Sequence, residues 1–251
     1  MKWYLKLKRF WMKKINWNDV RLVLILGAAI FLYSFSSKRN ENRMLKEADI
    51  EFKEAEDFIT HEKVNNLLIE NFGSIKSIRK DKLDLNSVEK SLDKNPMIDK
   101  AEVYATVDGK LKAIISQRKP VARIFDGGNS YYIDSRGDKM PLSETYTARV
   151  PIVTGMLDSI EKGRLNKLLN YINDDNFLKK NIIGMEVAPT GGLKMKTRNY
   201  GYEIQFGRPI NIEKKFNNYK AFLQDAVKDT LIEQYKTINL KFTQQVVCTK
   251  K

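Results

Sequence analysis

The most constraining feature of the chain is a run of sixteen residues without a charge, 22–37, between Arg21 and Lys38. Built as a helix at about 1.5 Å per residue, this run spans roughly 24 Å, slightly less than the roughly 30 Å of a hydrocarbon layer. The long side chain of Arg21 can reach the interface, and Trp17 and Tyr33 fall near the two interfaces, where amphipathic rings are favoured. The run therefore predicts a membrane-spanning helix over 22–37.

Two other interpretations of this run are a buried core helix and the apolar region of a signal peptide. A core helix is disfavoured because the run is apolar on every face and follows a basic segment. The basic region before it, 1–21, is long for a signal peptide, although Ser34 and Ser36 offer small residues at a spacing that a signal peptidase accepts. We expect an uncleaved anchor, with cleavage as the alternative.

The charges on the two sides of the run set its expected orientation. Residues 1–21 carry seven basic residues and one acidic residue, whereas 38–57 carry five basic and seven acidic residues. Basic residues favour the cytoplasmic side, so we expect a single-pass type II protein of the plasma (inner) membrane. Its parts would be a basic cytoplasmic tail at 1–21, a stalk at 38–47 and a periplasmic or otherwise extracytoplasmic domain. The tail alternates aromatic residues with lysines, which fits either a segment lying on an anionic leaflet or a disordered basic tail.

Composition narrows the functions of the part that follows the anchor. The formal net charge is +14, but the tail holds much of it, and the remaining basic residues are interspersed with acidic ones. Such a surface fits acidic lipid head groups or an acidic protein partner, and the lack of a dense basic run argues against nucleic-acid binding. Cys248 is the only cysteine, so the fold has no intramolecular disulfide and has to be held by its core.

Residues 48–119 carry the signals of a small α+β unit. The expected elements are a strand at 50–52, a helix capped by Thr60 and ended by Gly73, a helix from Asn86 to Asn95 with a capping box through Glu89, and strands at 98–107 and 111–117 joined through Asp108-Gly109. An Asp-Gly pair between alternating strands is a strong hairpin signal. The order strand, helix, helix, strand, strand defines a first extracytoplasmic domain.

Residues 120–251 predict a second domain, a mixed β domain with flanking helices. Pro120 cannot donate to a sheet ladder and marks the passage between the two domains. Turns are expected at 126–129 and 134–137, a helix face over 165–172, a meander of strands at 182–187, 193–197 and 202–206, a helix over 212–235 and a last strand within 237–248. In the last strand Ile238, Leu240 and Phe242 alternate with polar residues.

Several motifs occur in order along these two domains. The segment 95–124 ends in Arg118-Lys119-Pro120-Val121-Ala122, and it is followed by Tyr131-Tyr132-Ile133-Asp134 with Gly137 and Met140-Pro141, and by Val150-Pro151-Ile152-Val153-Thr154-Gly155. This ordered set resembles the POTRA domain and the β domain of the bacterial cell-division family FtsQ/DivIB, over most of 48–248. The resemblance implies an α+β protein with a cytoplasmic tail, one transmembrane helix, a POTRA domain at 48–119 and a β domain at 120–251.

The resemblance also implies a function. Members of this family are non-enzymatic scaffolds of the division complex at the septum, where they link early and late division proteins and recruit FtsB, which arrives with FtsL. The family's C-terminal strand has a Leu between polar residues, then a basic and an aromatic residue, and this pattern matches Leu240, Lys241 and Phe242. It implies that Lys241 attracts an acidic partner residue and that Phe242 is an apolar anchor, with core packing of Phe242 as the open alternative. The POTRA unit is expected to offer a second docking edge.

Catalysis has little support in the sequence. His61 is the only histidine and lies at an expected helix start, where an exposed structural role is the default, far along the chain from Cys248. The chain has no P-loop or dinucleotide fingerprint, and Asp174-Asp175 at a helix end are expected to be solvated carboxylates. We therefore expect no enzyme activity, cofactor, metal or small-molecule substrate.

Two other functions stay open from the sequence. A POTRA-type chaperone or translocation component for envelope proteins would share the first domain, although such proteins usually carry several POTRA units and this chain has one. An envelope enzyme acting on peptidoglycan is the third possibility. A scaffold is favoured because the C-terminal strand is expected at a sheet edge, to which a partner can add a strand of its own.

Overall fold

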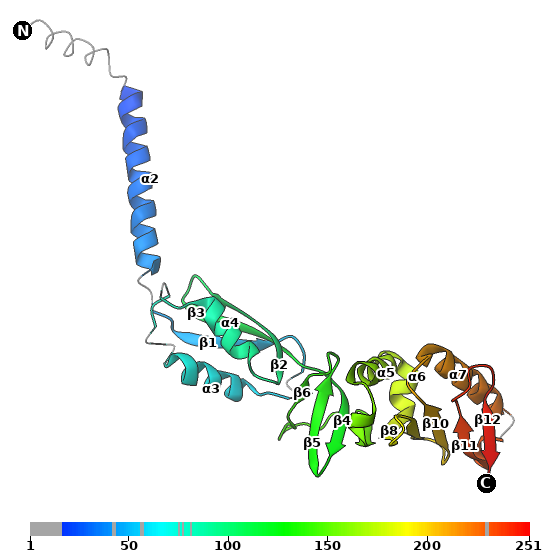
Figure 1. Cartoon of the computed structure of the whole chain (residues 1–251). Coiled ribbons are helices and arrows are strands. Elements are labelled where there is room, and N and C mark those ends of the chain that lie inside the picture. The colour runs from blue at the N-terminus through cyan, green and yellow to red at the C-terminus, as the bar shows by residue number, and fades with distance from the viewer. Residues whose placement is uncertain are drawn as a thin grey trace, which may run out of the picture.

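The computed structural model describes residues 17–41, 44–55, 58–74, 76, 78–80, 82–228 and 231–251, so most of the expected basic tail lies outside the described residues. The first element is α2, Trp17–Glu41, which stands apart from the rest of the chain (Figure 1). Within it, Trp17–Arg39 is long and apolar enough to cross a membrane, with a mean hydropathy of 1.8, and none of its most apolar window is buried. The alternative of a buried core helix is therefore wrong.

The first domain is a three-stranded sheet covered by two helices. Its elements in chain order are β1 (Glu47–Phe52), α3 (His61–Phe72), α4 (Leu85–Asp93), β2 (Ile98–Ala105) and β3 (Lys110–Gln117). Strand β3 lies in the middle of the sheet, parallel to β1 and antiparallel to β2. The predicted order of strand, helix, helix, strand, strand is confirmed, and β1 and β2 are the two edges of this sheet.

Local capping sets where the two helices begin. The Thr60 side chain caps α3 by accepting a backbone hydrogen bond from the first turn, as predicted. Helix α4 begins at Leu85, because Asp84 is its N-cap and accepts a hydrogen bond from the Asn86 amide at 3.1 Å. The predicted capping box between Asn86 and Glu89 is therefore wrong. The Glu89 carboxylate instead accepts a hydrogen bond from the Val103 amide in β2.

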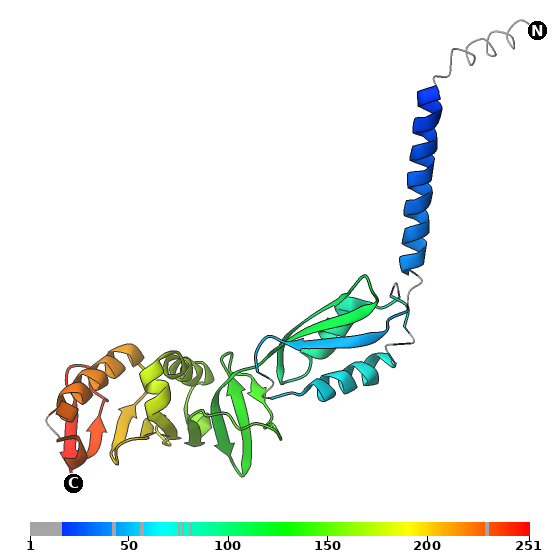
Figure 2. The same cartoon turned by 180° about the vertical axis from the view of Figure 1, so that it is seen from behind.

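The second domain is a nine-stranded sheet with its α-helices on one face, as both views show (Figures 1 and 2). The strands are β4 (Pro120–Asp126), β5 (Asn129–Asp134), β6 (Lys139–Met140), β7 (Ile152–Gly155), β8 (Ile182–Val187), β9 (Leu193–Thr197), β10 (Glu203–Gly207), β11 (Tyr235–Asn239) and β12 (Val247–Lys250). The helices are η2 (Leu157–Ser159), α5 (Lys162–Asp174), α6 (Asn176–Asn181), α7 (Ile212–Lys228) and η3 (Leu231–Gln234).

The order of strands across this sheet is β12-β11-β10-β9-β8-β7-β4-β5-β6. The pairs β4–β7, β7–β8 and β10–β11 are parallel, and the others are antiparallel. The predicted meander is present as β8, β9 and β10. The α+β class, with an N-terminal apolar helix, a small first domain and a mixed sheet with helices, is confirmed.

The C-terminal part differs from the sequence prediction. The helix expected over 212–235 ends at Lys228, and the strand expected within 237–248 is divided into β11 and β12, with the 240–246 loop between them. The Lys241 amide donates to the side-chain oxygen of Asn239 at 3.0 Å, which turns the chain directly after β11. The prediction of one continuous final strand is therefore wrong. The apolar and polar residues of the sequence keep alternating after Asn239, but the backbone turns there and the strand ends.

Two clusters of buried side chains stabilise the chain, and their border does not coincide with the border between the domains. The larger cluster lies between the nine-stranded sheet and its helices, and the smaller one fills the first domain. Tyr132 of β5 and Met140 of β6 belong to the smaller cluster, and the Tyr132 ring meets Phe58 edge to face at 6.2 Å between centroids. The start of the second domain thus completes the core of the first.

Candidate functional site

The C-terminal strand is one edge of the nine-stranded sheet. Strand β12 pairs antiparallel with β11, with Thr249 opposite Thr237 and Val247 opposite Asn239, and it stands last in the strand order. An edge strand presents backbone N–H and C=O groups on its outer side, which another chain can use to add a strand. Val247 is exposed, and Lys250 is the only charged residue of β12. The edge is therefore suited to strand addition.

The residues that the sequence assigned to partner binding lie beside this edge, in the 240–246 loop. Leu240 is 1% exposed and belongs to the larger core cluster, so it anchors the loop from inside. Lys241 is exposed, and Phe242 is 54% exposed. Of the two interpretations left open for Phe242, core packing does not hold. The structure brings an exposed cation and an exposed aromatic ring to the connection that leads into β12.

The β2 edge of the first sheet is capped by helix α4. The amides of Ala101 and Val103 donate to the carboxylates of Asp93 and Glu89, each at 2.8 Å. These two amides of an edge strand therefore already have acceptors within the chain. Side chains that cover an edge in this way discourage pairing with other strands.

The β1 edge carries a smaller cap. His61 Nε2, at the start of α3, lies 2.9 Å from the carbonyl oxygen of Ile50, and its ring meets the Phe52 ring at 4.8 Å between centroids. The imidazole thus has a structural place at a strand edge, in line with the default expected for it. The second docking edge expected on this domain is therefore covered in part on both sides, whereas β12 has no such cap among the described contacts.

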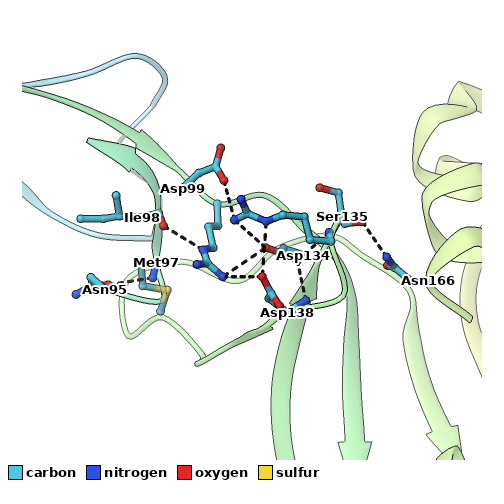
Figure 3. A network of polar contacts seen from close by, with 10 residues as sticks. Asn95, Met97, Ile98, Asp99, Asp134, Ser135, Asp138 and Asn166 are labelled. Carbon is cyan, nitrogen blue, oxygen red and sulfur yellow. Dashed lines mark hydrogen bonds and ion pairs between the residues drawn. The ribbon is translucent and has the colours of Figure 1, made fainter. Parts of the chain in front are cut away.

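The junction of the two domains is held by polar contacts (Figure 3). Arg118, between β3 and β4, donates from Nε to the Ile98 carbonyl at 3.0 Å and places Nη1 3.5 Å from Asp134 Oδ2. The Asp134 side chain is 5% exposed and also accepts the amides of Arg136 and Asp138, each at 2.9 Å. A nearly buried carboxylate with this many donors is satisfied. The network therefore fixes how the first domain joins the sheet that ends in β12.

Comparison with known families matches both domains. A family model described as "FtsQ/DivIB, C-terminal related" matches residues 119–249, which is more than half of the 251-residue chain. The chain belongs to the FtsQ/DivIB family. A model described as "POTRA-like domain" matches residues 46–116, the range of β1 to β3. The FtsQ/DivIB resemblance found in the sequence motifs is confirmed at the level of the family.

A curated relative from this family is the cell division protein FtsQ of Geotalea daltonii. It is 32% identical over 98 residues, which cover 36% of this chain and 35% of the relative. The chain is thus matched to about a third of the length of that FtsQ protein.

The described part of this FtsQ/DivIB chain holds no group of three or more His, Cys, Asp or Glu residues that could bind a metal ion. His61 lies in α3 and Cys248 in β12, in different domains, and burial raises the pKa of the Cys248 thiol, which disfavours the reactive thiolate. Burial also acts to raise the pKa of Asp175, but Lys220 and the amides of α6 outweigh it and hold that pKa below its usual value. Asp175 thus serves as the N-cap of α6, where its carboxylate accepts the amides of Phe177 and Leu178.

Sequence reasoning missed β12 and the caps of the first sheet. A signal for the first was Asn239, because Asn side chains bond the backbone two residues on and so end strands. A signal for the second was the spacing of Glu89 and Asp93, four residues apart on one face of an amphipathic helix. Both features separate the open β12 edge of the FtsQ/DivIB chain from the capped edges of its first sheet.

Proposed function

We propose that this chain is a non-enzymatic, single-pass membrane scaffold of the bacterial division complex, which links early and late division proteins by binding FtsB and FtsL. In this proposal it lies in the plasma (inner) membrane at the septum, with its N-terminus in the cytoplasm. Membership of the FtsQ/DivIB family supports the division role. The observation that carries the binding mode is the open β12 edge with Phe242 exposed beside it.

The proposed organisation is a cytoplasmic tail at 1–21, an anchor at 22–37, a stalk at 38–47, a POTRA-like domain at 48–119 and a β domain at 120–251. The unburied apolar helix α2 supports the anchor. The seven basic residues within 1–21 support a cytoplasmic tail, because basic residues are retained on that side. An uncleaved helix would keep the folded domains beside other division proteins that are anchored in the same membrane.

Partner binding is proposed to combine three contacts. A strand of the partner would pair with β12, so that main-chain hydrogen bonds supply much of the affinity. Phe242 would bury its exposed ring in the partner, and Lys241 would attract an acidic residue. Leu240, which completes the matched motif, would hold the loop to the core. Strand β12 carries only one charge, and Lys241 and Phe242 precede it. We therefore expect the partner segment to be acidic and partly apolar.

The alternative is a POTRA-type chaperone or translocation component. Such a protein would bind unfolded chains along an open edge of the first sheet. Here two amides of β2 already donate to the carboxylates of Asp93 and Glu89, and a carbonyl of β1 is hydrogen-bonded to His61. These caps count against a role in strand capture by the first domain. They leave β12 as the better edge for a partner.

A binding experiment with the full-length protein in detergent tests the proposal. We expect Phe242→Ala to weaken binding to an FtsB–FtsL complex by about 10- to 30-fold and Lys241→Glu to slow association. The matched control is Phe125→Ala, which removes another half-exposed ring, on β4, far along the sheet from β12. Unchanged binding by both loop variants would contradict the proposed site, and capture of unfolded envelope proteins instead would favour the chaperone.

A further inference from the structure

Helix α7 contacts the 240–246 loop directly. Asn218, half-buried on α7, donates from Nδ2 to the carbonyl oxygen of Thr243 at 3.1 Å. Thr243 follows Phe242, so this bond fixes the backbone next to the exposed ring. A loop tied at its centre by a helix side chain loses conformational freedom before any partner arrives.

The same helix buries a lysine under the start of this loop. Lys215 is 2% exposed and donates from Nζ to the carbonyl oxygens of Phe206 at 2.8 Å and Arg208 at 2.9 Å. The described residues place no carboxylate within ion-pair distance of Nζ, and burial lowers the pKa of Lys215. Nζ also lies 4.6 Å from the centroid of the Phe206 ring. Burying an ammonium costs free energy, which the two carbonyls and the ring offset only if they stay in place around it. Lys215 thereby fixes the backbone around Gly207, which lies between the two acceptor residues.

Gly207 leaves room for the 240–246 loop because it has no side chain. Its φ of 72° lies in the left-handed region, at a register shift between β9 and β10. A Cβ atom at this position would lie 2.9 Å from Cγ of Lys241, so the Lys241 stem runs directly over Gly207. The neighbouring Leu240 amide donates to the Gln205 carbonyl at 2.9 Å. The irregular end of β10 is thus the surface on which the loop begins.

We propose that Lys215, Gly207 and Asn218 are positioning residues of the partner site: they hold the 240–246 loop in the form that presents Phe242 beside β12, without contacting the partner. Lys215 shapes the end of β10, Gly207 admits the stem of Lys241, and Asn218 fixes the loop after Phe242. Because the loop is ordered before binding, little conformational entropy is lost in the complex. This inference rests on the proposed function and assigns part of the affinity to α7, which packs on a face of the sheet and does not form the edge to which the partner strand would add.

The test compares two neighbouring substitutions of equal charge change, Asn218→Asp and Asn217→Asp. Asn217 is exposed on α7, whereas Asn218→Asp keeps the size of the side chain and removes the donor to Thr243. We expect Asn218→Asp to speed amide hydrogen exchange in the 240–246 loop of the free protein and to weaken FtsB–FtsL binding by about 3- to 10-fold. Asn217→Asp should change neither, and both variants should unfold at the same temperature. Gly207→Ala should weaken FtsB–FtsL binding more than Asn218→Asp does, because the new Cβ would clash with Cγ of Lys241.

The outcomes separate this inference from the function on which it rests. If Phe242→Ala weakens binding while Asn218→Asp and Gly207→Ala bind normally, α7 does not position the site and the inference is overturned. The inference is also overturned if amide hydrogen exchange in the 240–246 loop is unchanged in Asn218→Asp and Gly207→Ala. If Phe242→Ala itself binds normally, the proposed function fails, and the inference falls with it.

Discussion

Arg118 Nη1 lies 3.5 Å from Asp134 Oδ2, across the junction between the two domains (Asp134 is labelled in Figure 3). A second guanidinium spans the same junction, since Arg136 Nη2 lies 2.8 Å from Asp99 Oδ1 in β2. Arg118 and Asp134 belong to two of the motifs, 118–122 and 131–134, that carry the FtsQ/DivIB resemblance. Their meeting gives these motifs a physical reason: together they set the direction in which the sheet leaves the first domain.

Removing the Arg118 side chain should destabilise the protein. Arg118→Met removes one of the two guanidinium groups at the nearly buried Asp134 carboxylate, while Arg136 stays with its Nη2 3.4 Å from Oδ2. We expect a loss of about 1.5–3 kcal/mol in the free energy of unfolding. Arg164→Met is the matched control, because its pair with Glu161 is exposed and should contribute less than about 1 kcal/mol. Denaturant unfolding of both variants measures the difference. Equal, small losses would show that the junction pair is unimportant.

The shared core predicts that the two domains unfold together. Tyr132 is 1% exposed and packs in the core of the first domain although it belongs to β5. We expect Tyr132→Ala to cost about 3–5 kcal/mol and to speed hydrogen exchange in both β3 and β4. Tyr131→Ala, which removes the half-buried neighbouring ring, should have a smaller effect. Faster exchange confined to one of the two domains would contradict a shared core.

The caps on β2 predict a gain of self-association when they are removed. Glu89→Ala combined with Asp93→Ala leaves the amides of Ala101 and Val103 without their acceptors on an edge strand. We expect the double variant to form oligomers at concentrations at which the wild type is monomeric within its detergent micelle. Sedimentation velocity measures this, and Lys90→Ala on the same helix is the control. A double variant that stays as monodisperse as the control would show that the caps do not guard the edge.

Two buried hydroxyls predict how stability depends on alkaline pH. Tyr202 and Tyr219 lie 2.7 Å apart, oxygen to oxygen, and burial raises the pKa of both above the usual 10.0. Above about pH 10 the unfolded chain loses protons that the folded chain keeps, so their contribution to stability is complete below that pH and is lost as the pH rises further. Tyr219→Phe removes one such group.

The comparison of wild type with Tyr219→Phe isolates this effect from other titrations. We expect the variant to be less stable by about 1–2 kcal/mol near neutral pH, because Asn181 and Tyr202 lose a partner. The difference in the free energy of unfolding should narrow between about pH 9 and about pH 11. A difference that stays constant over this range would contradict the assignment.

Local signals made much of the fold predictable. The uncharged run located α2, Thr60 located the start of α3, and Asp108-Gly109 located the hairpin between β2 and β3. Each signal acts within a few residues, through a cap, a turn or the period of apolar side chains. Such signals do not depend on where the rest of the chain lies.

The failures have two physical causes, a contact between distant residues and a local turn that interrupts a regular pattern. Glu89 sits where a capping box would place it, but its carboxylate accepts a hydrogen bond from Val103 instead. Phe242 continues the alternation of Ile238 and Leu240, but the backbone has already turned at Asn239. For Glu89 the local spacing is the same in both alternatives, so only the position of β2 decides between them. The support of the 240–246 loop by α7 is of the same kind.

The most direct test of the account is hydrogen exchange in β12 with and without a bound FtsB–FtsL complex. If a partner adds a strand to this edge, amides within Val247–Lys250 should become protected on binding, while those of the capped edge at Ala101 and Val103 should not change. Saturating FtsB–FtsL that leaves exchange in β12 and in the 240–246 loop as it is in the free protein would contradict the account.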